Sequence, residues 1–203
     1  MKIICIGLNY HDHIREFGGE VPAAPVFFLK ADSCLVTGNK PFFLPDFSSA
    51  IHYEIEVVLK ICRVGKNIAP RFASRYYEEI SLGIDFTARD IQQECRKKGL
   101  PWEICKSFDY AAPVGKFISK KKFADLQNLS FRLLLNGQCV QQGNTSDMIF
   151  SFDQIIAHVS QYMTLKTGDL IFTGTPVGVG PVKINDHLEG YLQDLKLLDM
   201  KVK

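Results

Sequence analysis

The stretch "AIHYEIEVVLK", residues 50–60, is typical of a β-strand because β-branched and aromatic residues fill most of its positions. Successive side chains of a strand point to opposite faces, so His52, Glu54 and Glu56 share one face. Two neighbouring carboxylates on that face have two interpretations. The simpler is the solvated outer face of an antiparallel sheet, and the other is a metal site.

The composition is that of a globular protein. Hydrophobic residues make up 46% of the 203 residues and charged residues 23%, which argues against disorder. A chain of this length can bury a sizeable core, and we expect a single domain over residues 1–203. The net charge is only +2, and the lysine run at 120–122 lacks aromatic residues for base stacking, so we expect no nucleic-acid partner.

The cysteines and the apolar runs bear on the cellular location of the protein. Its six cysteines include no C-x-x-C pair, which speaks against a structural zinc site or a disulfide framework. The apolar run in "MKIICIGL" is too short for a secretory signal. No stretch reaches the roughly 18 to 20 apolar residues that a membrane span needs. We therefore expect a cytoplasmic protein with no membrane partner.

Helix and strand signals mix along the chain without the regular alternation of a doubly wound sheet. Strands are expected at residues 2–7, 25–30, 54–60 and 80–85 and in the C-terminal tail, with a hairpin at Asn136-Gly137. Helices are expected at about 70–79, at 88–98 behind a Thr87 and Asp90 capping box, at 150–163, and in a short segment that Asp12 caps. The pattern predicts a mainly β, α+β fold.

Asp85 ends one of these strands and could join Glu54 and Glu56 in a metal site. Three carboxylates are the hard oxygen ligands that suit Mg²⁺, Mn²⁺ or Ca²⁺. The alternative is that Asp85 belongs only to the cap region of the next helix.

Other polar residues could supply the chemistry. His13 and Glu16 lie three residues apart on a short helix, where a carboxylate can orient an imidazole that activates water. Lys30 and Lys106 could each place a cation at the rim of a pocket. The alternative for all four is a solvated surface position.

The glycine-rich segment "TGTPVGVG", residues 173–180, lacks both the P-loop ending and the dinucleotide-binding spacing. It still offers backbone N–H groups and the Thr175 hydroxyl to a small carboxylate. The alternative is a plain tight connection.

Together these pieces resemble the fumarylacetoacetate hydrolase family. The resemblance rests on "GLNYHDHIRE", "FFLK", "HYEIEVVLK", "GIDFTARDIQQE", "KGLPWEICKSFD", "NGQCVQQGNTSDMIF" and "GDLIFTGTPVGVG", which occur in the family's order and spacing. It spans nearly the whole chain. The text "TARDIQQECRKKGLPW" is most similar to the short single-domain branch that includes acylpyruvate hydrolases and oxaloacetate decarboxylases.

The resemblance implies a mixed β-sandwich roll, a homodimer, and one Mg²⁺ or Mn²⁺ per subunit. It assigns the metal to Glu54, Glu56 and Asp85, catalysis to His13, Glu16, Gln92 and Lys106, and substrate binding to Lys30, Arg89, Gly174 and Thr175. It also implies a lid over residues 11–24 of the single catalytic domain.

Three functions are compatible with these residues, each with a small-molecule keto acid as ligand. The first is a metal-dependent hydrolase that cleaves a carbon–carbon bond of acylpyruvates, with oxaloacetate decarboxylation as a second or even main activity. The second is an isomerase or tautomerase of 2-hydroxy-dienoate or oxaloacetate-type substrates on the same site. The third is a non-catalytic protein that binds a small dicarboxylate.

Overall fold

The computed structural model describes residues 1–16 and 18–203. Its strands are β1 (Ile3–Gly7), β2 (Val26–Lys30), β3 (Leu35–Val36), β4 (Ile51–Tyr53), β5 (Ile55–Ile61), β6 (Tyr77–Ile84), β7 (Thr87–Ala88), β8 (Ala112–Pro113), β9 (Ile118–Ser119), β10 (Ser130–Leu135), β11 (Gln138–Asn144), β12 (Leu170–Phe172), β13 (Gly180–Pro181), β14 (His187–Leu192) and β15 (Leu195–Lys201). Its α-helices are α1 (His11–Glu16), α2 (Pro70–Ala73), α3 (Arg89–Lys98), α4 (Glu103–Lys106) and α5 (Phe152–Tyr162). The predicted mainly β, α+β class is confirmed.

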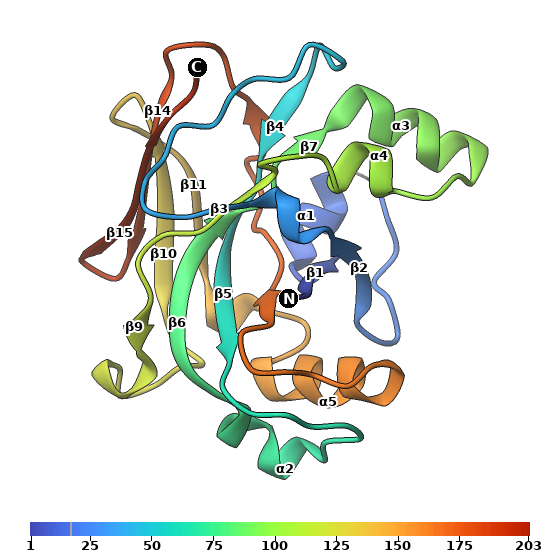
Figure 1. The fold of residues 1–203 in the computed structure, drawn as a ribbon, viewed down its shortest axis with the longest axis vertical. Helices are drawn as coiled ribbons and strands as arrows, with labels where there is room; N and C mark the ends of the chain where they lie inside the picture. The colour runs from blue at the N-terminus through green and yellow to red at the C-terminus, as the bar shows by residue number, and fades with distance from the viewer. Residues whose placement is uncertain (17) are drawn as a thin grey trace.

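Two sheets form the body of the molecule. The larger has the strand order β2-β1-β12-β5-β6-β9, in which β1 and β12 run parallel and the other pairs antiparallel. The second has the order β11-β10-β14-β15 and packs against the long strands β5 and β6 (Figure 1). Gly190 of β14 lies against Ile55 and Leu82 across this interface, and the facing apolar side chains form a common core.

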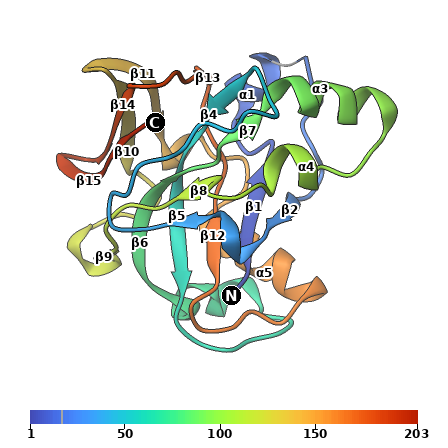
Figure 2. The same cartoon turned by 45° about the horizontal axis from the view of Figure 1, so that its top comes forward.

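A small three-stranded sheet, β13-β4-β7, connects this body to the helices that carry polar residues. Figure 2 shows β4 and β7 next to α3, with α1 and α4 at the same end of the molecule. Because β7 runs directly into α3 and β4 directly precedes β5, residues of the small sheet, of the larger sheet and of α3 meet there.

Several element predictions are confirmed. The strands expected at 2–7, 25–30 and 54–60 form β1, β2 and β5, and the tail forms β14 and β15. Asn136 and Gly137 have φ of 52° and 81°, so the hairpin between β10 and β11 has the left-handed turn that this dipeptide favours. Gly18, also left-handed, follows α1 as expected.

Three element predictions are wrong in detail, two of them near the start of a helix. The helix expected at 70–79 ends as α2 at Ala73 and a 3-10 turn to Tyr76, because Tyr77 and the residues after it pair with β5 instead. The capping box of α3 is absent, since its N-cap Ala88 makes no side-chain hydrogen bond. Asp90 accepts instead from Ser48 and Ser49, so tertiary contacts replace the local one.

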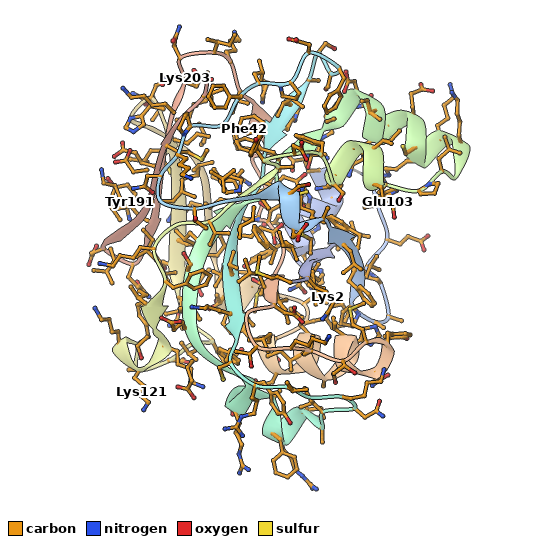
Figure 3. The ribbon with its side chains drawn as sticks, in the orientation of Figure 1. Lys2, Phe42, Glu103, Lys121, Tyr191 and Lys203 are labelled. Carbon is orange, nitrogen blue, oxygen red and sulfur yellow. The ribbon has the colours of Figure 1, made fainter. Side chains whose placement is uncertain are left out.

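Asp12 also lies inside the first turn of α1 instead of capping it, and contacts Arg15 at 3.2 Å. The lysine run at 120–122 forms a 3-10 turn in which Lys120 is half-buried and the other two lysines are exposed; Lys121 lies at the outer edge of the molecule in Figure 3. None of the helices within residues 1–16 and 18–203 combines the length and apolar character of a membrane crossing.

Gly115 provides a test of how the two sheets are joined. Its N–H donates to Leu82 of β6, and the next N–H donates to Leu197 of β15. A Cβ at this position would lie 2.2 Å from the Leu197 carbonyl oxygen. We expect Gly115→Ala to lower the free energy of unfolding by about 2 to 3 kcal/mol, because backbone must move to relieve the overlap.

Chemical denaturation checks this value. Gly19→Ala is the matched control, since its Cβ would meet nothing closer than 3.5 Å. Equal stability of the two variants would contradict the role given to Gly115.

Candidate functional site

The opening stretch is interrupted at Glu54. The β4 strand ends at Tyr53 and β5 begins at Ile55, so Glu54 leaves the regular ladder. Its carbonyl accepts from the N–H of Asp85 at 2.8 Å. Glu54 is 5% exposed and Glu56 1% exposed, so the interpretation as a solvated sheet face is wrong.

Three carboxylates meet at this point. Glu54 and Glu56 flank the start of β5, and Asp85 follows the end of the neighbouring strand β6. Each offers an oxygen, and these oxygens lie within 4.8 Å of one another. The antiparallel pairing of β5 and β6 explains this convergence, because it puts the start of one strand beside the end of the other.

Lys106 at the end of α4 contacts two of these carboxylates. Its ammonium donates to Glu54 Oε2 at 2.8 Å and to Asp85 Oδ2 at 2.7 Å. A third hydrogen bond reaches the Thr87 hydroxyl at 2.6 Å, and the whole side chain is buried. Lys106 therefore holds α4 and the ends of β5 and β6 around one charged centre.

Two other cations complete the charge balance. Lys30 lies 2.7 Å from Asp85 Oδ1, and the Arg89 guanidinium pairs with Glu54 Oε1. Glu56 differs, because no cation in the described part of the chain forms an ion pair with it. Its Oε2 accepts from the N–H of Gly174 at 2.6 Å.

These contacts shift the pKa values of the two glutamates in opposite directions. Burial would raise the pKa of Glu54, but the charges of Lys106 and Arg89 bring it below its usual value. For Glu56, burial and then the negative charge of Asp85 raise the pKa well above its usual value. Of the two glutamates, Glu56 is thus the one whose ionised form the surrounding residues stabilise less.

The donor set fits a divalent metal ion. Three converging carboxylates are the oxygen ligands that Mg²⁺ and Mn²⁺ prefer. The raised pKa of Glu56 is a second observation, because a nearby divalent cation would offset the repulsion from Asp85. Glu54, Glu56 and Asp85 would hold the ion.

The predicted dyad is also brought together. His13 Nδ1 lies 3.1 Å from Glu16 Oε2 on one face of α1, and His13 is buried. The other Glu16 oxygen accepts from the N–H of Gly178 at 3.4 Å, which connects α1 to the glycine-rich loop. Residue 17, within the predicted lid 11–24, lies outside the described residues.

The glycine-rich loop differs from expectation in one respect. Its Gly174 N–H is not available to a substrate carboxylate, because it donates to Glu56. Thr175 keeps its predicted position, since it lines the cavity beside the carboxylates. Its hydroxyl oxygen accepts from Gln141 Nε2 at 3.0 Å, which leaves the hydroxyl hydrogen able to donate elsewhere.

A cavity of about 130 Å³ lies over this centre, which is a small volume for a binding site. Its lining includes the sequence-predicted residues His13, Glu54, Glu56, Asp85, Arg89, Gln92, Lys106 and Thr175. Glu16 and Gly174 contact lining residues without lining the cavity. Lys30, expected at the rim, is instead buried at 3% exposure and donates to the Phe86 and Lys106 carbonyls.

Sequence reasoning missed part of the cavity wall. Phe28 and Trp102 form an aromatic side, with ring centroids 5.8 Å apart, and Arg96 lies on the same helix as Gln92. Phe28 and Trp102 stand inside quoted motifs, but an aromatic residue in a strand or turn is normally assigned to the core. Arg96 had a usable signal, because it follows Gln92 by four residues and so shares its helix face.

Gln141 is a second missed residue, and it connects the metal-binding strand to the glycine-rich loop. Its Oε1 accepts from the N–H of Ile55 at 2.9 Å, the first amide after the break at Glu54. Its Nε2 donates to Thr175 and, at 2.9 Å, to the Pro176 carbonyl. A β-bulge directs it inward: Leu133 pairs with Gln141 and Leu134 with Cys139, so the residue between them is skipped.

A second acidic cluster lies on β14 and β15. His187, Glu189 and Asp199 are close enough to share an ion, but they are only half-buried. Lys196 already contacts Glu189 at 2.9 Å and Asp199 at 2.7 Å. This cluster is a surface ion-pair network, and we assign it no metal.

Comparison with known proteins adds the following findings. Residues 2–203 match the model of the fumarylacetoacetate (FAA) hydrolase C-terminal family. The chain is 41% identical to the mitochondrial oxaloacetate tautomerase FAHD1 of Bos taurus, over 100% of this chain and 91% of the relative. It is 43% identical to the mitochondrial oxaloacetate decarboxylase of Dictyostelium discoideum, over 90% of this chain and 84% of the relative.

A solved structure is similar as well. The fumarylpyruvate hydrolase of Pseudomonas aeruginosa, in complex with Mn²⁺ and pyruvate, superimposes with a TM-score of 0.94 at 31% identity. The match covers 100% of this chain and 89% of that one. These relatives are enzymes, and they differ in the reaction that their names state.

The hydrogen bonds of Gln141 predict a loss of stability on its replacement. Gln141→Leu would leave the buried Ile55 N–H and the Pro176 carbonyl unpaired, so we expect the free energy of unfolding to fall by about 2 to 4 kcal/mol. Urea titration measures it. Gln142→Leu, at the exposed neighbouring position, is the control and should stay within about 0.5 kcal/mol of the wild type. An equal loss in both variants would contradict the bridging role.

Proposed function

The chain belongs to the fumarylacetoacetate hydrolase family, and from that premise we propose that it is a divalent-metal-dependent enzyme acting on 2-oxo acids of the oxaloacetate type. The reaction we propose is enolate formation at C3, which gives tautomerisation of oxaloacetate or, with loss of carbon dioxide, its decarboxylation. The similarity to an oxaloacetate tautomerase and an oxaloacetate decarboxylase supports this choice of substrate.

One observation carries the proposal. Three buried carboxylates offer oxygens within 4.8 Å of one another, and the ammonium of Lys106 contacts two of them. With a divalent ion held there, such a site would suit a substrate that presents a carboxylate and an adjacent carbonyl oxygen. A small cavity favours a compact acid such as oxaloacetate.

The residues around the cavity have distinct proposed tasks. When bound at Glu54, Glu56 and Asp85, Mg²⁺ or Mn²⁺ supplies Lewis-acid polarisation of the 2-oxo group. Lys106 adds positive charge where the 2-oxo oxygen becomes negative. The Thr175 hydroxyl donates to the C1 carboxylate, because its oxygen already accepts from Gln141.

Proton transfer is assigned to α1. His13 takes the C3 proton, while Glu16 orients the imidazole and stabilises its protonated form. The electron pair of the broken C–H bond moves toward the 2-oxo oxygen, and protonation of that oxygen gives the enol. In decarboxylation the C3–C4 bond breaks instead, and its electron pair gives the enolate of pyruvate. Arg89 and Gln92 contact each other and form the wall on the α3 side.

Hydrolysis of acylpyruvates is the second candidate function. The contact of His13 with Glu16 favours it, because such a dyad can activate a water for attack on the distal carbonyl. The fumarylpyruvate hydrolase that superimposes on this chain supports it as well. Cleavage would release a carboxylic acid and the enolate of pyruvate, so the same charged groups would serve both reactions.

Other expectations from the sequence and from the family resemblance stay predictions. They are the homodimer, the lid over residues 11–24, the single catalytic domain and the cytoplasmic location.

Metal removal tests the proposed function. Chelator-treated protein is expected to lose turnover of oxaloacetate by about 100-fold or more, since Lewis-acid stabilisation is worth several kcal/mol, and Mg²⁺ or Mn²⁺ should restore it. Oxaloacetate, acetylpyruvate and fumarylpyruvate are assayed on one preparation, by the decay of the enol form and by pyruvate release. Undiminished turnover after metal removal would contradict the proposal.

Replacement of His13 separates hydrolysis from decarboxylation. His13→Ala is expected to lower acetylpyruvate hydrolysis by about 100-fold or more, because the attacking water loses its base. Oxaloacetate decarboxylation should fall much less, since it needs neither a water nor a base to break the C3–C4 bond. His11→Ala, on the exposed side of α1, is the matched control for both assays. Equal losses in both reactions would refute this assignment of His13.

A further inference from the structure

One face of α3 carries three polar side chains toward the cavity. Arg89, Gln92 and Arg96 are spaced three and four residues apart, which aligns them along the helix, and all three line the cavity. Side chains of a helix lean toward its N-terminus, so Arg96 leans toward Gln92 and the carboxylate centre. Arg96 marks the end of this row furthest from the start of the helix.

The four basic residues that line the cavity differ in their partners. Arg89 pairs with Glu54, Lys106 with Glu54 and Asp85, and His13 with Glu16. Arg96 has no side-chain ion pair or hydrogen bond with any residue in 1–16 or 18–203. It is also exposed, so its guanidinium is accessible at the cavity mouth. Arg96 is therefore the cation in this wall that protein carboxylates leave available.

The two ends of a substrate of the proposed kind differ chemically and would contact different residues. Its C1 carboxylate and 2-oxo group belong at Thr175 and at the divalent ion that the three carboxylates would hold. Oxaloacetate and fumarylpyruvate carry a second carboxylate at the other end, whereas acetylpyruvate ends in a methyl group. Besides the polar centre, the cavity lining includes Phe28 and Trp102, which suit an apolar stem, and Arg96.

We infer that Arg96 binds the distal carboxylate of the substrate and so selects 2-oxo dicarboxylates over 2-oxo acids with a neutral tail. This inference rests on the proposed function and adds the substrate class to it. Guanidinium is suited to the task because its planar N–H groups match the two oxygens of a carboxylate.

Steady-state kinetics of the Mn²⁺-supplemented protein tests the inference. We expect Arg96→Gln to raise KM for oxaloacetate and fumarylpyruvate by about 10-fold or more, with kcat changed less, because the contact acts on substrate binding. KM for acetylpyruvate should stay within about 2-fold. Arg96→Lys keeps the charge without the planar group and should give intermediate values.

Lys97→Gln is the matched control, because it removes the same charge from the next residue of α3 without touching the cavity wall. It should behave as the wild type with all three substrates. A loss of equal size on acetylpyruvate in Arg96→Gln would overturn the inference in favour of a structural role. Unchanged KM values for both dicarboxylates would overturn it in favour of a solvated surface arginine.

A binding measurement keeps this inference separate from the proposed reaction. If the wild type turns over none of the three acids, the proposed function fails. Titration calorimetry with pyruvate and 3,3-difluorooxaloacetate then tests whether Arg96 binds a distal carboxylate. Arg96→Gln should then weaken only the binding of 3,3-difluorooxaloacetate, which carries the second carboxylate. Equal affinities of variant and wild type for that compound would overturn the inference.

Discussion

The contact of the Lys106 ammonium with Glu54 and Asp85 is the interaction on which the site depends. Three carboxylates and three cations are buried within a few ångströms, and each would be costly to bury without the others. Lys106 reaches them from α4, Lys30 from β2 and Arg89 from α3. The need to pair these charges therefore fixes three separate elements against the ends of β5 and β6.

The residues on the buried side of the three carboxylates differ in role from those on the cavity side. Lys30 approaches from the buried side and makes no contribution to the cavity wall, while Arg89, Gln92 and His13 border the cavity. Lys30 thus neutralises charge without bordering the cavity, whereas Arg89 and Lys106 pair with carboxylates and also line the cavity.

Much of the fold follows from local patterns, and the exceptions have a common cause. Strand β5 and the Asn136-Gly137 turn were predictable because their signals are local. The capping box was not, because Thr87 accepts from Lys106 and Asp90 from a distant serine pair. At the site, period two predicted that Glu54 and Glu56 share a face. Their convergence with Asp85, and the part played by Gln141, depend on pairing between distant strands that no local pattern contains.

The β-bulge beside Gln141 gives the hairpin an unexpected influence. Strand register has a period of two, so one residue more or less in β11 turns every following side chain to the opposite face. Without the bulge Val140 would oppose Leu133 in place of Gln141, and the amide of Ile55 would lose its acceptor. The number of residues between the Asn136-Gly137 turn and Gln141 therefore determines which side chain of β11 faces the site. No residue of that turn itself lines the cavity.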